Sequence, residues 1–228
     1  MNVFKYSGSM PAARGDTRQL IIDTALRLFE ERGYADTTMR AIASEAGLAP
    51  SNAYYWFRSK DELVQAFYLA IQEQHRARAA EVLASGGTVV DRLRAVEHAY
   101  LDVIERYHGF GRAFVSTALA TPEANPLSES SRRPREESMA IFADVVAGAQ
   151  PPVPAKVRSL LPELLWLCHL AITLFWVTDG SPGQRRTRRL VDASVPLVTP
   201  MLRIARLPWG GAAIDQVRTA LAVVMERP

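Results

Sequence analysis

Cysteine and histidine are scarce in this chain of 228 residues. Cys168 is the one cysteine, so no disulfide can form within the chain, and a single thiol is typical of a reducing compartment. No cysteine and histidine spacing suits a structural zinc ion, since the histidines are scattered as His75, His98, His108 and His169. We therefore expect a cytoplasmic protein with no metal ion or other cofactor.

Long apolar segments are also missing. Residues 164–177 form the strongest apolar run, but His169 interrupts it, and it is shorter than the roughly 20 residues that span a bilayer. Residues 1–15 contain no continuous apolar stretch of the kind found in secretory signals, and they carry Lys5 and Arg14. We expect a loose leader over residues 1–15 and no membrane segment.

Net charge is small as well. The 27 Lys and Arg residues nearly balance the 24 Asp and Glu residues, so the net charge of +3 neither excludes nor indicates a nucleic-acid partner. Apolar residues make up 48% of the chain and charged residues 22%, which is typical of a folded globular protein. Ser85-Gly86-Gly87 interrupts a helical pattern and indicates a change of organisation there.

The first folded segment has the spacing of three helices. In residues 16–32, apolar side chains recur at steps of three and four and form one stripe, which contains Leu20, Ile21, Ala25, Leu28 and Phe29. Thr37 and Thr38 can cap a second helix that ends at Gly47, and Pro50 suits the first turn of a third helix over residues 50–57. Two short helices joined by a tight turn with glycine predict a helix-turn-helix.

The third predicted helix has one face for the core and one for a partner. At 100° per residue, Ala53 and Phe57 share the inward face, whereas Ser51, Asn52 and Tyr55 point the other way. Asn52 can pair with an adenine edge in the major groove of DNA, and the hydroxyls of Ser51 and Tyr55 can donate or accept there. This face is therefore predicted to read bases.

Neighbouring polar groups are expected to contact phosphates. Tyr54 and Trp56 flank the reading face, Lys60 lies at the start of a fourth helix, and Arg40 can reach a phosphate or a base. The predicted DNA-binding set is Thr38, Arg40, Ser51, Asn52, Tyr54, Tyr55, Trp56 and Lys60. A run of aromatic residues is more often buried in a core, but the bulky rings of residues 54–57 cannot all be buried in so small a module.

The same segment resembles the TetR family of bacterial transcription regulators. The resemblance covers about the first quarter of the chain and is carried by Ala25-Leu26-Arg27-Leu28-Phe29, Gly33-Tyr34, Thr38, Ile42-Ala43, Ala46-Gly47, Tyr54, Phe57 and Ser59-Lys60. It implies an all-helical homodimer in which a helix-turn-helix domain precedes a larger ligand-binding domain. It also implies phosphate contacts by Tyr54 and Lys60 and a core position for Phe57. The chain departs from the family pattern at Ala49, Ser51-Asn52 and Trp56.

Helical patterns continue along the chain, and no strand pattern competes with them. Ser59 and Glu62 have the spacing of a capping box for a fourth helix that runs to about residue 83. Further helices are predicted over residues 90–107, 110–120, 134–149, 154–178, 187–205 and 214–225, with a loop at 122–134 and a bend or break at Pro196 and Pro200. The predicted fold is all-α, with a helix-turn-helix DNA-binding domain at residues 16–62 and a larger ligand-binding and dimerisation domain at residues 63–228.

The helix within residues 154–178 is apolar around nearly its whole circumference, so it should be buried on all sides. We expect one of its faces on its own core and another on a second subunit, where the helix within residues 187–205 joins an isologous contact. An effector cavity should lie between the fourth helix and those that follow, lined by Tyr100, Ile104, Phe110, Phe114, Trp166 and His169. The alternative that Trp166 and His169 are only satisfied core residues stays open.

Three functions compete. The first is a repressor that binds a palindromic double-stranded operator as a homodimer, with reading helices about 34–36 Å apart, and that a lipophilic or aromatic small-molecule effector releases. The second is an enzyme for a lipophilic substrate, but Cys168 and His169 point about 100° apart on a helix and cannot readily form a dyad. The third is a protein that binds DNA without sequence preference. The basic cluster at residues 185–189 is interpreted as a solvated surface or as salt links between subunits. The sequence favours the ligand-responsive regulator over an enzyme.

Overall fold

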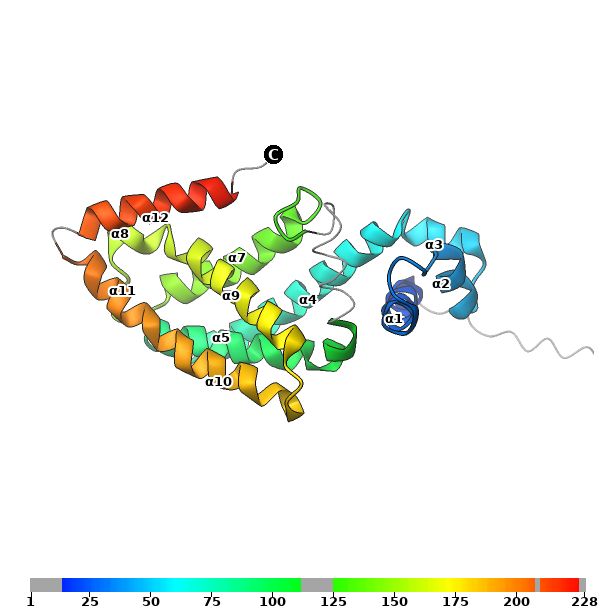
Figure 1. Ribbon diagram of the computed structural model, residues 1–228, viewed down its shortest axis with the longest axis horizontal. Coiled ribbons are helices and arrows are strands. Elements are labelled where there is room, and N and C mark those ends of the chain that lie inside the picture. Colours follow the sequence, from blue (N-terminus) through cyan, green and yellow to red (C-terminus); the bar gives the residue numbers. More distant parts are fainter. Residues whose placement is uncertain (1–13, 112–124, 208–209, 226–228) are drawn as a thin grey trace, which may run out of the picture. The chain divides into compact units, whose positions relative to one another are not determined.

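The computed structural model describes residues 14–111, 125–207 and 210–225, and these form helices and turns without a strand (Figure 1). The all-α prediction is therefore confirmed. The chain divides into two compact units, residues 1–63 and residues 64–228. Most of the predicted leader, and the predicted helix at residues 110–120 beyond Gly111, lie outside the described residues.

The first unit has the helices predicted for it, namely α1 (Arg14–Arg32), α2 (Met39–Glu45), α3 (Pro50–Trp56) and the start of α4 (Lys60–Leu83). Gly33 ends α1 with a φ of +83°, a left-handed conformation that glycine adopts without steric cost. The Thr38 hydroxyl caps α2 by accepting from the Ala41 amide at 3.1 Å. Ser59 caps α4 in the same way, whereas the Glu62 carboxylate accepts from the Arg58 amide at 2.7 Å instead of completing the predicted capping box.

Apolar residues from the first three helices form the core of this unit. The fully shielded side chains, at 0% exposure, include Ile21, Ile22, Ala25, Leu28, Ile42, Ala43 and Ala53. Leu20, predicted for the inward stripe of α1, is instead 44% exposed. A single residue turns the helix by 100°, and Ile21 and Ile22 occupy the inward face, so Leu20 falls at its edge.

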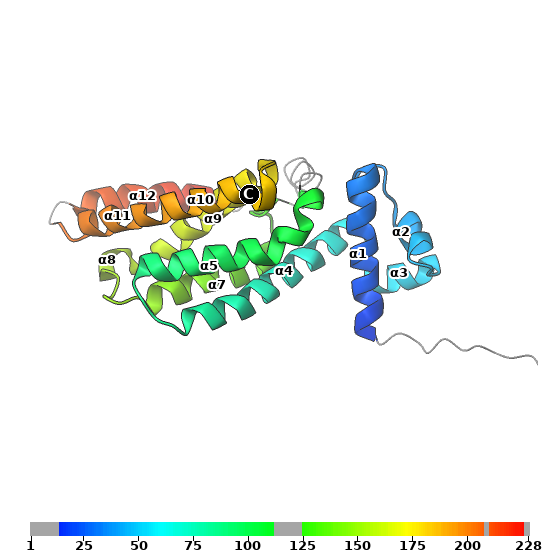
Figure 2. The ribbon, with the colours of Figure 1, turned by 90° about the horizontal axis from the view of Figure 1, so that it is seen from below.

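The second unit is built from longer helices. It contains the rest of α4, α5 (Val89–Ile104), η1 (Glu105–Tyr107), α7 (Arg132–Ala147), α8 (Ala155–Arg158), α9 (Leu161–Thr178), η3 (Pro182–Gln184), α10 (Arg185–Ser194), η4 (Val195–Leu197), α11 (Val198–Ala205) and α12 (Gly210–Met225). Helix α5 packs against α7 and α10, and α9 packs against the same two helices. Figure 2 shows α4, α5 and α7 running alongside one another, and side chains from these helices and from α9 line a common space.

Helix boundaries differ from the predictions in several places, most clearly beside prolines. The predicted helix at residues 154–178 is two helices, α8 and α9, because the Pro162 ring is incompatible with a helix interior and sits instead in the first turn of α9. The predicted helix at residues 90–107 tightens into a 3₁₀ turn from Glu105. The predicted break at Pro196 is confirmed as the 3₁₀ turn η4, whereas Pro200 lies in the first turn of α11 without a break.

Helix α9 is long and apolar enough to cross a membrane by length and composition alone, but this is weak evidence of a span. In this structure α9 lies between α7 and α10, with Trp166, Ile172 and Trp176 buried. It is not buried on all sides within one chain, because Leu174 is 45% exposed and Cys168 is also exposed. The apolar surface of this helix therefore divides into an inward and an outward face.

Arg92 holds the ends of two helices together. Its guanidinium donates to the Leu83 carbonyl at 3.1 Å, at the end of α4, and to the carbonyls of Asp144 and Val145 at 2.8 and 3.0 Å, at the end of α7. The Leu83 and Asp144 carbonyls also accept from the Gly86 and Gly148 amides at 3.2 Å each, and the buried cation adds a second, charge-assisted hydrogen bond at these negative helix ends. Arg92, which lies on α5, thus joins the end of α4 and the end of α7 to α5.

The basic cluster at residues 185–189 begins α10, and Arg188 pairs within the chain. Its guanidinium lies 2.9 Å from the Asp102 carboxylate and 3.6 Å from that of Glu105. Arg186 lies over the Phe175 ring at 5.7 Å. The cluster therefore contributes links between α10 and its own neighbours.

Candidate functional site

Helix α3 presents a polar and aromatic face to solvent. Ala53 and Phe57 are buried at 0% and 2% exposure, so the inward face of the predicted helix is as expected. Ser51 and Asn52 are exposed, and Tyr55 and Tyr54 are 74% and 47% exposed. Large exposed rings on a short helix are costly unless a partner covers them, so this face has the character of a binding surface.

The remaining members of the predicted DNA-binding set lie in the same unit. Thr38 and Arg40 are exposed at the start of α2. Trp56 is half-buried, and its ring meets that of Tyr55 edge-on with centroids 5.3 Å apart. The set therefore combines donors and acceptors on two consecutive helices, a geometry suited to bases and phosphates.

Lys60 differs from the other members because its ammonium turns toward the protein. Its Nζ lies 4.3 Å from the centre of the Tyr34 ring and donates to the Tyr34 carbonyl at 2.5 Å. Burial lowers the pKa of Lys60. The Tyr34 hydroxyl in turn donates to the Asp61 carboxylate. Lys60 thus ties the turn after α1 to the start of α4, a contact between distant residues that sequence spacing did not reveal.

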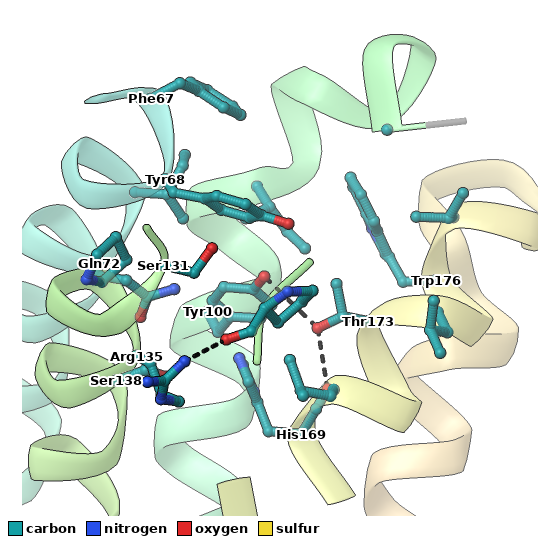
Figure 3. A pocket seen from close by; sticks show the side chains of 18 of the residues that line it. Phe67, Tyr68, Gln72, Tyr100, Ser131, Arg135, Ser138, His169, Thr173 and Trp176 are labelled. Carbon is teal, nitrogen blue, oxygen red and sulfur yellow. Dashed lines mark hydrogen bonds between the residues drawn. The ribbon is translucent and has the colours of Figure 1, made fainter. Parts of the chain in front are cut away.

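The second unit contains a cavity of about 340 Å³ walled by α4, α5, α7 and α9 (Figure 3). Its volume is in the range of small-molecule sites, and its lining is predominantly apolar. The structure brings together the predicted lining residues Tyr100, Ile104, Phe110, Trp166 and His169. Phe114 lies outside the described residues.

Buried polar side chains lie on one wall of this cavity. His169 Nδ1 donates to the Glu97 carboxylate at 3.0 Å, and the Tyr100 ring meets the imidazole edge-on at 4.2 Å. Burial raises the pKa of Tyr100 to about 12, so its phenol stays neutral. Thr173 Oγ1 donates to the His169 carbonyl at 2.9 Å. His169 is thus anchored by α5, and Glu97 is a partner that no sequence pattern pointed to.

Cys168 does not join this wall. Its side chain is exposed whereas His169 is 2% exposed, as expected for neighbours on a helix. Other lining residues that sequence reasoning missed are Gln72, Ser138 and Trp176. These residues belong to three different helices, so no local motif could have grouped them.

A loop contributes to the lining of the cavity. Asn125, Pro126 and Leu127 line it, and the Arg135 guanidinium donates to the carbonyls of Pro126 and Ser128 at 2.8 and 3.0 Å. This loop falls within the segment predicted from its prolines to lack regular structure. Arg135 therefore positions the loop over the apolar interior.

An apolar surface lies on the outer side of the helices predicted to form a dimer. Its exposed side chains are Leu174 on α9, Leu197 on η4, and Met201 and Ile204 on α11, at 45%, 62%, 47% and 42% exposure. Part of α9 is covered differently, since Leu164 and Leu167 pack against a cluster that includes Ile214 and Leu221 of α12.

Two family models match the chain. The model described as "Bacterial regulatory proteins, tetR family" matches residues 21–67, and the model described as "Tetracyclin repressor-like, C-terminal domain" matches residues 92–218. The first match covers α2, α3 and the exposed face described above. The second alone spans more than half of the chain and includes most of the cavity wall.

The curated relatives are bacterial transcription regulators. The chain is 29% identical to the HTH-type transcriptional repressor KstR2 of Mycobacterium tuberculosis over 104 residues. These aligned residues make up 46% of this chain and 50% of the relative. It is 30% identical to the HTH-type transcriptional regulator UidR of Escherichia coli over 112 residues. This alignment covers 48% of this chain and 54% of the relative. The chain spans about half the length of the curated relatives it matches.

Solved structures share the fold. A TetR transcriptional regulator from Nitrosomonas europaea aligns with a TM-score of 0.61 at 19% identity, covering 80% of this chain and 97% of that one. The regulator FadR from Bacillus subtilis, solved in complex with stearoyl-CoA, aligns with a TM-score of 0.61 at 16% identity, covering 78% and 96%. At these identities the likeness shows a common architecture.

Proposed function

Because the chain belongs to the TetR family of bacterial transcription regulators, we propose that it is a homodimeric, cytoplasmic repressor that a lipophilic or aromatic small molecule releases from its DNA operator. The observation that carries this proposal is the apolar cavity of about 340 Å³ in the second unit, in a chain whose first unit exposes a polar helix face. A ligand that binds the cavity can regulate DNA binding only if it has unequal affinity for the DNA-bound and free states.

In this proposal α3 reads the major groove. Asn52 would pair with a base edge, with Ser51 and Tyr55 beside it. Tyr54 and Trp56 would contact the flanking phosphates, and Thr38 and Arg40 would add contacts from α2. Lys60 would reach a phosphate only by giving up part of its contact with the Tyr34 carbonyl. The 74% exposure of Tyr55 supports this assignment.

The proposed dimer uses the outward faces of α9 and of α10 to α11. Leu174, Leu197, Met201 and Ile204 would lose their exposed apolar area to the second subunit, a favourable change of roughly 25 cal/mol for each Å² removed from water. An isologous contact would repeat the same patch on both partners, and a two-fold protein matches a palindromic operator.

The nature of the effector follows from the lining of the cavity. Aromatic and aliphatic side chains such as Phe67, Ile71 and Phe110 dominate it, which favours a lipophilic or aromatic molecule. The FadR neighbour was solved with stearoyl-CoA, which supports an effector with an apolar portion for this fold.

The test begins with selection of bound sequences from random double-stranded DNA. We expect an inverted repeat with half-sites about 10 base pairs apart or a multiple of this. The double variant Asn52→Ala/Tyr55→Ala should lower the affinity for that sequence at least ~10-fold, since each lost base contact is worth about 1–3 kcal/mol. Gln216→Ala, an exposed amide on α12, is the matched control and should leave the affinity unchanged.

The same operator serves to test release. A molecule that raises the unfolding temperature of the protein should also weaken operator binding. Binding that depends on salt alone, with no preferred sequence, would instead indicate a non-specific DNA-binding protein. Retention of full operator affinity in the double variant would contradict the reading face.

A further inference from the structure

Three polar side-chain atoms from the cavity wall are shielded from solvent and have no hydrogen-bond partner among the described residues. They are Gln72 Oε1, Ser138 Oγ and Trp176 Nε1, and their residues are 8%, 2% and 3% exposed. Buried polar groups in folded proteins are almost always paired, because an unpaired one costs stability. By contrast, the Thr173 hydroxyl on the same cavity has its acceptor at 2.9 Å.

The three residues lie on opposite sides of the space. Figure 3 shows Gln72 and Ser138 on the side formed by α4 and α7, and Trp176 across the cavity on α9. Trp176 is held in place, because His108 Nε2 donates to its carbonyl at 2.9 Å and the two rings meet edge-on at 4.9 Å. Gly111 leaves room for the indole, since a Cβ there would lie 2.8 Å from the ring. The unpaired indole N–H is therefore a feature of a packed side chain.

The apolar residues occupy the middle of the cavity wall. Ile71, Ile104, Phe110 and Leu170 contribute to it, and they can offer only van der Waals contact to a ligand. The indole N–H of Trp176 only donates, the Gln72 carbonyl oxygen only accepts, and the Ser138 hydroxyl can do either. A ligand that satisfies all three must carry complementary groups at separate ends.

We infer that the effector has an apolar body with two polar ends: an uncharged oxygen acceptor, such as a keto or ether group, facing Trp176, and a hydroxyl facing Gln72 and Ser138. This inference rests on the proposed function, because it specifies the chemistry of the molecule that the cavity binds. It goes further by excluding a plain hydrocarbon and an anion as the preferred occupant.

A hydroxyl suits Gln72 and Ser138 better than a carboxylate does. A hydroxyl can donate to Gln72 Oε1 and accept from Ser138 Oγ at the same time, whereas an ionised carboxylate has only acceptors and would repel the Gln72 oxygen. The guanidinium of Arg135, which also lines the cavity, donates to the carbonyls of Pro126 and Ser128. Because this guanidinium is engaged by the loop, an anion at this end would lose its hydration and would have to compete with these carbonyls for Arg135.

Four probes with the same ten-carbon chain test the inference. They are 10-hydroxydecan-2-one, which has both groups, decan-2-one and decan-1-ol, which have one each, and 9-oxodecanoic acid, in which a carboxylate replaces the hydroxyl. Calorimetric titration of the full chain should show that the hydroxyketone binds about threefold to tenfold more tightly than either single-group probe. The carboxylate should bind more weakly than the hydroxyketone by a similar factor or more.

Variants assign each end to its residue. Trp176→Phe keeps a ring but removes the N–H, so it should abolish the advantage of the hydroxyketone over decan-1-ol. Ser138→Ala should abolish the advantage over decan-2-one, and Gln72→Leu is a second variant for that end. Ser194→Ala, which removes a hydroxyl on α10 outside the cavity, is the matched control and should change none of the ratios. Ser138→Ala loses no hydrogen bond of the free protein, so its unfolding temperature should not fall by more than about 2 °C.

The outcomes separate this inference from the proposed function. If all uncharged probes bind equally and weaken operator binding, the proposed function stands and the two-ended effector is refuted. Tighter binding of 9-oxodecanoic acid than of the hydroxyketone would also refute it. If no probe binds, both the two-ended effector and the cavity as effector site are refuted, while sequence-specific DNA binding is tested independently by the selection experiment.

Discussion

The buried histidine His75 gives this protein a strong and testable dependence of stability on pH. His75 lies on α4 at 0% exposure, and its Nε2 donates to the Val96 carbonyl at 3.1 Å. Its Nδ1 has no partner among the described residues, and its ring stacks on that of His169 at 5.9 Å. Burial, with the neighbouring His169 as a smaller cause, lowers the pKa of His75 to about 3.

Unfolding returns His75 to water, where the pKa of histidine is about 6.5. Between pH 6.5 and pH 3 the unfolded chain therefore binds one more proton at this residue than the folded chain does. The free energy of unfolding must fall as the pH falls through this window, by about 1.4 kcal/mol for each pH unit well inside it. Lowering the pH from 7 to 5 should remove about 2 kcal/mol through His75 alone.

Urea denaturation at pH 7 and pH 5 measures this difference. In His75→Leu the loss of unfolding free energy between the two pH values should be smaller than in the unmodified protein by about 2 kcal/mol. His75→Gln is a second variant in case Leu packs poorly. His98→Gln, which removes a histidine at the surface of the same unit, is the matched control and should change the loss by less than about 1 kcal/mol. An unchanged pH dependence in both His75 variants would refute the assignment of a neutral, buried His75.

Four further predictions concern other residues. Arg40→Ala should reduce the salt dependence of operator binding, lowering the slope of log affinity against log salt by about 1, if Arg40 contacts a phosphate. Arg92→Met should lower the free energy of unfolding in urea by about 3 kcal/mol, because it removes hydrogen bonds from a charged donor to three helix-end carbonyls. Burial opposes the charge of Asp179, but hydrogen bonds from Ser181 and Thr187 outweigh this effect and hold the pKa of Asp179 well below its usual range. The stabilising effect of the Asp179 carboxylate should therefore be complete above about pH 4 and be lost as the pH falls further. Asp179→Ala should lower the free energy of unfolding in urea by about 1–3 kcal/mol at pH 7. Cys168 is exposed on α9, and the proposed dimer covers the outward face of this helix. The rate of Cys168 alkylation should therefore fall as the protein concentration rises through the dimerisation range. An alkylation rate that does not depend on protein concentration would contradict the proposed interface.

The local features of the first unit could be predicted from the sequence. Thr38 caps α2, Gly33 and Gly47 end helices with positive φ, and Ala53 and Phe57 point inward from α3. Each of these depends on residues within one or two helical turns, so periodicity and capping rules suffice. The break before Pro162 is also local, but the apolar pattern continues across it, so periodicity predicts one helix over residues 154–178 where the structure has two.

The sequence by itself therefore determined the order of helices, the exposed face of α3 and the family resemblance. Only the tertiary structure decided what the polar residues do. His169 meets Glu97 from another helix, Lys60 turns to the Tyr34 carbonyl, and Ser138 joins a cavity wall without a partner. Helical spacing tells which way a side chain points from its own axis, but the identity of the group it meets depends on how separate helices pack, and that is a property of the folded chain alone.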